Sequence, residues 1–342
     1  MFFSGGIKID LFKKYNQKKR FKKASEFFNQ GKYQKSLEIY EEILKDDSND
    51  SQALFGRAIS LSGLEKYQEA LESLDNILER DPEDAYLLED AYFWFHRGVS
   101  LSELGAYNKA ITSFKKVLEL DPKFPDAEYN IGISLIQLGE YESAMESFDK
   151  VLKLNPELGE AWFNKGYSAV EAEKYQEALK AYDKLSKLEP DNPDAWLQKG
   201  YTLNKLQRYD DALKAHDKGL ELYPEHPTVW SNSANLLRKL GKQQEAIKSY
   251  DKSLELDPHD VDVWYLKGMV LGELGKNQEA LESYNKALEL DPLDAYAWYG
   301  KSEIFQKQKN NQEALKCLNK ALELKPDCEL AKKAKEKILK KL

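Results

Sequence analysis

Apolar and polar residues follow one another in a pattern that returns every 34 residues. In the type repeat, 261–294, the segment 261–274 is apolar around most of its circumference, and 278–290 has apolar residues along one face. Both spacings are helical. Gly275 follows the first segment and Pro292 the second, and these residues typically mark helix ends. The pattern predicts a helix, a tight turn, a second helix and a second turn.

Marker residues recur at the same step along most of the chain. They are Trp162, Trp196, Trp230, Trp264 and Trp298; Pro156, Pro190, Pro224, Pro258, Pro292 and Pro326; and Ala144, Ala178, Ala212, Ala246, Ala280 and Ala314. A period of this length indicates stacked small units rather than one closed core. It predicts nine units, at 17–50, 51–84, 91–124, 125–158, 159–192, 193–226, 227–260, 261–294 and 295–328, with a six-residue insert at 85–90.

The segments outside the units are expected to be helical as well. Residues 1–16 form a basic segment that we expect to extend the first helix, beginning near Asp10. Residues 329–342 are expected to form a capping helix, with Leu330, Ala334, Ile338 and Leu342 covering Trp298 and Ala314. This gives nine helix pairs and one final helix.

Counted within a unit, most units have an aromatic residue at place four, Gly or Ala at place eight, Ala at place 20, an aromatic residue at place 24 and Pro at place 32. The terminal units depart from this pattern, with Arg20, Ser36 and Ser48 in unit one and Ser302 and Leu318 in unit nine. The chain resembles the tetratricopeptide-repeat family over residues 17–328. The resemblance implies an all-α, right-handed superhelical solenoid of antiparallel helix pairs, whose first helices line a concave groove that binds peptides or partner surfaces. Place seven departs from the family's leucine, since seven units have a cation there whose stem we expect to pack while its charge reaches water.

The distribution of charge along the chain indicates which classes of partner are disfavoured. The chain has 51 basic and 59 acidic residues, a net charge of −8, with basic residues gathered at the two ends. An acidic body argues against general nucleic-acid binding. The basic ends fit either solvated helix termini or contact with an anionic partner. No apolar run approaches the roughly 20 residues of a membrane span, so we expect a cytoplasmic protein.

No enzyme signature occurs in the sequence. Phosphate-binding loops, nucleophile motifs and zinc-protease motifs are missing, and Cys317 and Cys328 have no metal-ligand spacing around them. His216 stands at place 24, where a core histidine is the expected role. We therefore expect a protein that is not an enzyme and that has no cofactor and no metal site.

The groove is the candidate binding site. At places five and nine, aromatic rings recur that would suit recognition or would simply pack between helices: Tyr129, Phe163, Tyr167, Tyr201, Tyr265 and Tyr299. At place six, four consecutive units have Asn130, Asn164, Gln198 and Asn232. Carboxamides both donate and accept, so this row could clamp a peptide backbone, although asparagine is also ordinary at that place. The carboxylate clamp of the family's chaperone-binding branch is not expected.

Self-association is the alternative hypothesis. Residues 84–104 could form one first helix of about 20 residues, projecting about 9 Å farther than the others. Its added turns contain Tyr86, Leu87, Leu88, Tyr92 and Phe93, a surplus of apolar surface. Residues 85–93 are the expected contact. The leading hypothesis remains a scaffold for a protein or peptide ligand.

Overall fold

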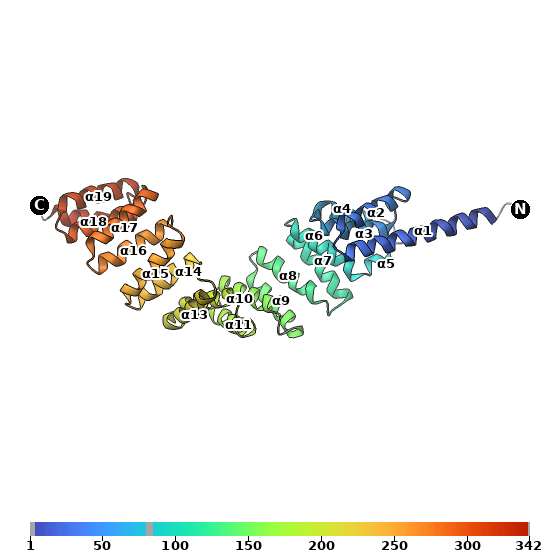
Figure 1. Cartoon of the computed structure of the whole chain (residues 1–342), viewed down its shortest axis with the longest axis horizontal. Coiled ribbons are helices and arrows are strands. Elements are labelled where there is room, and N and C mark those ends of the chain that lie inside the picture. The colour runs from blue at the N-terminus through green and yellow to red at the C-terminus, as the bar shows by residue number, and fades with distance from the viewer. Residues whose placement is uncertain (1–3, 80–84, 341–342) are drawn as a thin grey trace. The chain divides into compact units, whose positions relative to one another are not determined.

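The structure is a computed structural model that describes residues 4–79 and 85–340 (Figure 1), with side chains described for 16–79 and 87–340. The described residues form helices and turns and no strand. The predicted all-α fold of antiparallel helix pairs is confirmed. The first helices are α1 (Ser4–Asn29), α3 (Ser51–Gly63), α6 (Ala91–Glu103), α8 (Pro125–Gln137), α10 (Gly159–Glu171), α12 (Pro193–Lys205), α14 (Pro227–Lys239), α16 (Val261–Glu273) and α18 (Ala295–Lys307).

Each first helix is followed by a second helix of the same repeat. The second helices are α2 (Tyr33–Asp46), α4 (Tyr67–Leu78), α7 (Tyr107–Leu120), α9 (Tyr141–Leu154), α11 (Tyr175–Leu188), α13 (Tyr209–Leu222), α15 (Gln243–Leu256), α17 (Asn277–Leu290) and α19 (Asn311–Leu324). The final helix is α20 (Glu329–Leu339), and the insert contributes the short helix α5 (Ala85–Leu88).

The chain divides into two compact units, residues 1–174 and 175–342. In both units consecutive helices pack on one another, and first helices also contact the first helix of the next repeat, as α6 contacts α8 and α16 contacts α18. This arrangement places the first helices of each unit in a row, as a stack of repeats requires.

Small and large residues alternate inside each repeat. A Cβ added to Gly132, at place eight, would lie 2.7 Å from the ring of Phe148, at place 24. Ala144 and Phe148 are fully buried. Because no side chain fits between the two helices at Gly132, the glycine sets how closely they approach, as close packing demands.

The turn between the two helices has the same left-handed residue in every repeat. Gly275 has φ +76°, which glycine adopts without steric cost. Four repeats place a residue with a side chain there, and their φ values lie between 56° and 60°: Glu65, Glu173, Gln207 and Lys309. These four turns carry strain that a glycine would relieve.

The insert does not lengthen the first helix of the third repeat, so the expected helix over 84–104 is wrong. α5 ends at Leu88 and α6 begins at Ala91. Asp90 separates them, because its carboxylate accepts a hydrogen bond from the backbone N–H of Tyr92 at 2.8 Å and so caps α6. Leu87 and Phe93 are buried, which removes part of the predicted apolar surplus. The side chain of Tyr86 lies outside the described residues.

The two ends differ from expectation in detail. α1 begins at Ser4 rather than near Asp10. In α20, Ala331 and Ile338 are buried against the last repeat and Ala334 packs beside them. Leu330 was expected to help cover the repeat but is 57 % exposed. The reason is register, since Ala331 follows the buried Ala297 by one full repeat. Leu342 lies outside the described residues.

Candidate functional site

Each tryptophan at place four is tied to the turn before its helix. The indole Nε1 donates a hydrogen bond to the carbonyl oxygen of the proline six residues earlier, at 2.8–3.1 Å, in five repeats: Trp162 to Pro156, Trp196 to Pro190, Trp230 to Pro224, Trp264 to Pro258 and Trp298 to Pro292. Trp94 donates to Leu88 of the insert at 2.9 Å. The tryptophan therefore orients its helix against the preceding turn.

The cations at place seven join neighbouring repeats. Five of the seven lie near a carboxylate at place 25 of the repeat before them: Arg57 and Glu41 (3.9 Å), Arg97 and Asp75 (2.9 Å), Lys165 and Asp149 (2.5 Å), Lys199 and Asp183 (2.7 Å), and Lys267 and Asp251 (2.6 Å). In these five repeats the charge is paired with a carboxylate of the preceding repeat rather than only solvated. The side chains of the three lysines are only 17–22 % exposed.

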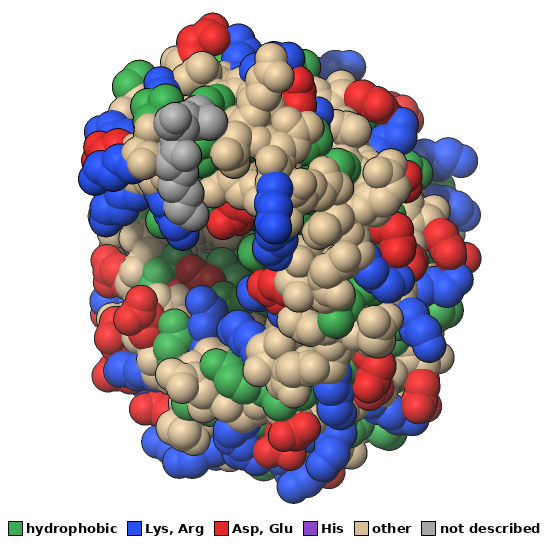
Figure 2. Space-filling model, turned by 90° about the vertical axis from the view of Figure 1, so that its left-hand side faces the viewer, with side chains coloured by type: hydrophobic (Ala, Val, Ile, Leu, Met, Phe, Trp, Pro, Cys, Tyr) green, Lys and Arg blue, Asp and Glu red, His purple; other side chains and the backbone are tan. Residues whose placement is uncertain are grey.

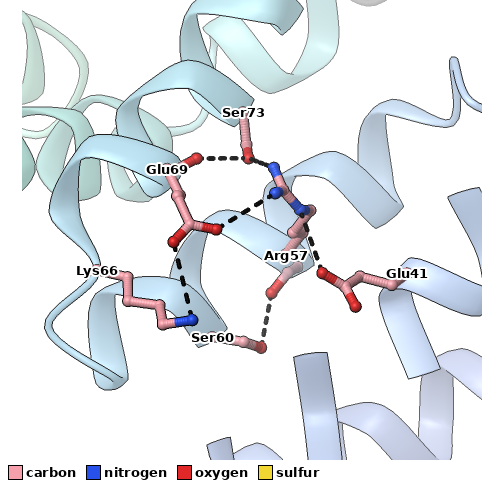
Figure 3. Close-up of polar contacts among 7 residues, drawn as sticks. Glu41, Arg57, Ser60, Lys66, Glu69 and Ser73 are labelled. Atoms are coloured by element: carbon pink, nitrogen blue, oxygen red, sulfur yellow. Dashed lines mark hydrogen bonds and ion pairs between the residues drawn. The ribbon is translucent and has the colours of Figure 1, made fainter. Parts of the chain in front are cut away.

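The environment of Arg57 shows how such a cation is held (Figure 3). Its guanidinium donates to the hydroxyl of Ser73 at 2.6 Å and lies 3.9 Å from Glu41 and 3.8 Å from Glu69. Where a tryptophan at place four is followed by a lysine at place seven, the lysine also lies over the indole ring, as Lys267 does over Trp264 at 5.0 Å. Such a cation–π contact adds to the ion pair. These residues hold the repeats together and are not available to a ligand.

In the first unit, the predicted amides already form internal hydrogen bonds. Asn164 Nδ2 donates to the hydroxyl of Tyr129 at 2.9 Å, and Asn130 Nδ2 donates to the backbone oxygen of Asp126 at 2.7 Å. Burial, followed by the nearby Glu160 carboxylate, raises the pKa of Tyr129. Each of these two amides therefore already uses one of its two N–H donors inside the unit.

The aromatic rings of the first unit are exposed to different degrees. Tyr129 is half-buried and packs edge-on against Phe148, with ring centroids 5.7 Å apart. Phe163 is also half-buried. Tyr167 is 36 % exposed and makes an edge contact with Tyr141 at 6.5 Å. Tyr167 offers the most accessible ring of these three.

In the second unit, Tyr201 has the same exposure as Tyr167, 36 %. Gln198 and Asn232 are half-buried, and their side-chain amides form no hydrogen bond within the described part of the chain. Tyr265 and Tyr299 are half-buried. The hydroxyl of Tyr299 donates to Glu303 at 2.9 Å. Two amides and one ring thus remain available on α12 and α14.

A surface cavity of about 540 Å³ lies beside Tyr265. Tyr296, Leu293 and Lys325 also line it. Lys325 lies over the ring of Tyr296 at 4.7 Å, and Leu293 is 70 % exposed. The cavity joins an aromatic ring of the predicted row to accessible apolar surface.

Sequence reasoning overlooked one group of residues on α14. The Tyr250 hydroxyl donates to Asn235 Oδ1 at 2.7 Å, and burial raises the pKa of Tyr250 to about 12. The Nε atom of Arg238 is buried without a hydrogen-bond partner. Lys239 Nζ donates to Asn204 Oδ1 of the preceding repeat at 3.3 Å. The signal in the sequence that could have revealed this group is the segment 226–244, which contains no acidic residue.

Charged side chains of both signs are interspersed over the face drawn in Figure 2. Within the described residues, no cluster of three or more His, Cys, Asp or Glu side chains could hold a metal ion. None of the described helices combines the length and the hydrophobicity that a membrane span requires.

Comparison with known families supports the reading of the repeats. The model of the tetratricopeptide repeat protein 21 N-terminal ARM repeat matches residues 27–237. A tetratricopeptide repeat model matches residues 265–327, and a TPR repeat model matches residues 234–275. No curated protein sequence matches the chain.

Solved structures of repeat proteins are similar to parts of the chain. YrrB, described as a TPR protein with an unusual peptide-binding site, is 26 % identical with a TM-score of 0.51, and the match covers 56 % of this chain and 99 % of YrrB. A tetratricopeptide repeat protein from Parabacteroides merdae is 19 % identical with a TM-score of 0.52, over 73 % of this chain and 98 % of that protein.

Proposed function

This chain belongs to the tetratricopeptide-repeat family, and from that premise we propose that it is a protein-interaction scaffold whose first helices bind an extended peptide or partner segment. The supporting observation is the accessible aromatic surface on those helices. Tyr167 in one unit and Tyr201 in the other are each 36 % exposed. By contrast, Phe148 and Tyr250 on second helices are fully buried. Exposed rings beside polar groups are typical anchors for a partner.

The likeness to YrrB favours a peptide as the ligand. That protein is described as having an unusual peptide-binding site, and the match covers 99 % of its length. An extended peptide offers one N–H and one C=O per residue, which carboxamides such as Gln198 and Asn232 can bind without reading side chains.

The amides do not contribute equally. Gln198 and Asn232 can receive a peptide without losing an internal bond. Asn164 already donates one N–H to the hydroxyl of Tyr129 at 2.9 Å, so only its second N–H and its oxygen remain for a peptide unless that bond is exchanged. Exchange of one hydrogen bond for another gains little free energy. In the second unit, Gln198, Tyr201 and Asn232 are therefore the proposed principal contacts.

Selection of peptides from a displayed random 12-residue library tests this function. The full chain should select peptides reproducibly, and Tyr201→Ala or the double change Gln198→Ala/Asn232→Ala should weaken their binding at least tenfold. Tyr223→Ala is the matched control, because Tyr223 is 47 % exposed but lies just past a second helix. Undiminished binding in the Tyr201 and double variants would exclude the first-helix surface, and failure to select any peptide would count against the function.

Self-association is a second candidate because Tyr92, beside the insert, is 59 % exposed. Its ring makes an edge contact with Phe124 at 5.4 Å. If this surface joins two copies, light scattering will give a mass that rises with concentration, and Tyr92→Ala will abolish the rise. A constant monomer mass would exclude self-association through residues 85–93.

A further inference from the structure

The first helices of repeats six and seven are unusual in their charge. Residues 195–209 and 226–244 contain no Asp or Glu, although the chain has 59 acidic residues in 342. The same stretches hold several cations, among them Lys205, Arg238 and Lys239. The first helix of repeat eight, in contrast, contains Asp262 and Glu273.

The cations lie together at the last turns of α12 and α14. Lys239 Nζ donates to Asn204 Oδ1 at 3.3 Å, so the ends of the two helices are adjacent. Lys239 also lies over the ring of Tyr209 at 4.8 Å, and Lys205 lies over Tyr201 at 5.3 Å. Rings and an amide therefore position these two lysines.

Arg238 is held in place without a counterion. Its guanidinium lies beside the hydroxyl of Tyr250, which itself donates to Asn235 Oδ1 at 2.7 Å. The Nε atom is buried and has no hydrogen-bond partner. Within the described residues, neither Arg238 nor Lys239 forms an ion pair, whereas Lys199 and Lys267 on neighbouring helices each pair with an aspartate at 2.7 and 2.6 Å.

Helix-end electrostatics explain only part of this arrangement. A cation in the last turn of a helix is stabilised by the helix dipole, which accounts for the location of Lys205 and Lys239. It does not account for a buried guanidinium nitrogen left without an acceptor, since such a group costs free energy until it is paired. Arg238 as a whole is only half-buried, so an anionic ligand can still pair with the charge of its guanidinium group.

We propose that the surface formed by Tyr201, Asn204, Lys205, Asn235, Arg238 and Lys239, here called the basic face, binds an acidic stretch of a peptide. The inference rests on the proposed function and names the class of peptide. Guanidinium groups match carboxylates in a two-pronged geometry. Packed helices lie about 8–10 Å apart, and an extended chain advances about 3.3 Å per residue. The two helices therefore suit Asp or Glu residues about three positions apart.

Charges beside the basic face favour a peptide over a nucleic acid. Asp194 lies in the first turn of α12, and Asp262 and Glu273 lie at the two ends of α16. A nucleic acid carries a phosphate at every step along each strand, so a strand that extended beyond the basic face would meet Glu273 at the last turn of α16, or Asp194 and Asp262 at the first turns. A short acidic stretch meets only the cations.

The composition of peptides selected by the full chain tests the inference. From the random 12-residue library, the wild type should select peptides enriched in Asp or Glu pairs about three positions apart. Replacing these residues by Asn or Gln in a selected peptide should weaken binding at least tenfold in fluorescence anisotropy. The double variant Arg238→Gln/Lys239→Gln should bind the acidic peptide more weakly by a similar factor. Added salt should also weaken this binding.

The control removes the same charge elsewhere. Lys248→Gln/Lys252→Gln changes two exposed lysines of α15 and should leave binding within twofold of wild type. Circular dichroism melts of both double variants verify the fold. Selected peptides without acidic enrichment would overturn the inference while leaving the proposed function intact, and failure to select any peptide would remove both. Tighter binding of a single-stranded oligonucleotide than of the acidic peptide would also overturn it.

Discussion

Trp264 donates its indole N–H to the carbonyl oxygen of Pro258 at 3.0 Å, so the first helix of repeat eight is bonded to the turn that precedes it. The same bond recurs in four other repeats that have a tryptophan at place four. Two residues that a repeat pattern treats as separate markers therefore form one structural unit. The proline ends a helix and also presents the acceptor.

Trp264→Phe isolates this bond, because phenylalanine keeps a ring and loses the donor. We expect the free energy of unfolding to fall by about 0.5–1.5 kcal/mol, the usual range for one hydrogen bond. Because repeats contact only their neighbours, hydrogen exchange should increase mainly in repeats seven to nine. A variant with wild-type stability would show that the hydrogen bond contributes nothing.

Asn285→Asp should add an ion pair that repeats eight and nine lack. Asn285 stands at place 25, where Asp251 pairs with Lys267 at 2.6 Å, and the facing cation is Lys301. We expect a gain of about 0.2–1 kcal/mol in chemical denaturation, reduced by high salt. In a Lys301→Met background the gain should vanish. An equal gain in both backgrounds would mean that the aspartate acts through something other than Lys301.

Lys309→Gly should stabilise the last repeat. Lys309 has φ +60°, a left-handed conformation that costs a residue with a side chain about 1–2 kcal/mol. Glycine removes that cost but loses about 0.5–1 kcal/mol of chain entropy, which leaves a net gain of up to about 1.5 kcal/mol. Gln308→Gly is the control, since Gln308 has φ −78° and should lose stability. If thermal melts show Gln308→Gly to be more stable than Lys309→Gly, the backbone at Lys309 is not strained.

Stability should fall below neutral pH because His216 is buried as a neutral base. Burial lowers its pKa to about 4 from 6.5, so the unfolded chain takes up a proton that the folded chain excludes. Its contribution is present above pH 6.5 and is lost as the pH falls toward 4, with a slope of at most about 1.4 kcal/mol per pH unit. His96 acts the same way in the first unit.

His216→Phe should flatten this dependence, since place 24 holds Phe148 in repeat four. The exposed His259 provides the control, His259→Gln, which should leave the slope unchanged. Melting temperatures measured between pH 7 and pH 5 give the comparison. A variant that loses stability with acid as steeply as wild type would assign the effect to other groups.

The sequence was sufficient to predict the helices and the pairing of small with large residues where two helices touch. Gly132 and Phe148 could be paired because both recur at fixed places and their sizes are complementary. Register also explains the buried face of α20, where continuing the 34-residue step from Ala297 would have selected Ala331 over Leu330.

Contacts between repeats were harder to predict, because they depend on side-chain direction rather than on period. Lys267 and Asp251 are 16 residues apart and look unrelated along the chain, although aligning the repeats shows that acids at place 25 tend to precede cations at place seven. The hydrogen bond from Asn164 to Tyr129 has no corresponding signal in the aligned repeats. The break after Leu88 depended on the capping carboxylate of Asp90, which the apolar pattern around it concealed.

The ion pairs between repeats determine which repeats can be duplicated in tandem without leaving a charge unpaired. Repeat two carries both halves of the joint, Arg57 toward its predecessor and Asp75 toward Arg97 of its successor. A tandem copy of that repeat would set the duplicated arginine against Asp75 and the duplicated aspartate against Arg97, so every charge keeps a partner. Repeat seven has Ser233 at place seven, and its copy would leave Asp251 facing a serine. A repeat that has both a cation at place seven and an acid at place 25 can therefore be duplicated without leaving a charge unpaired, whereas a repeat that lacks one of them cannot.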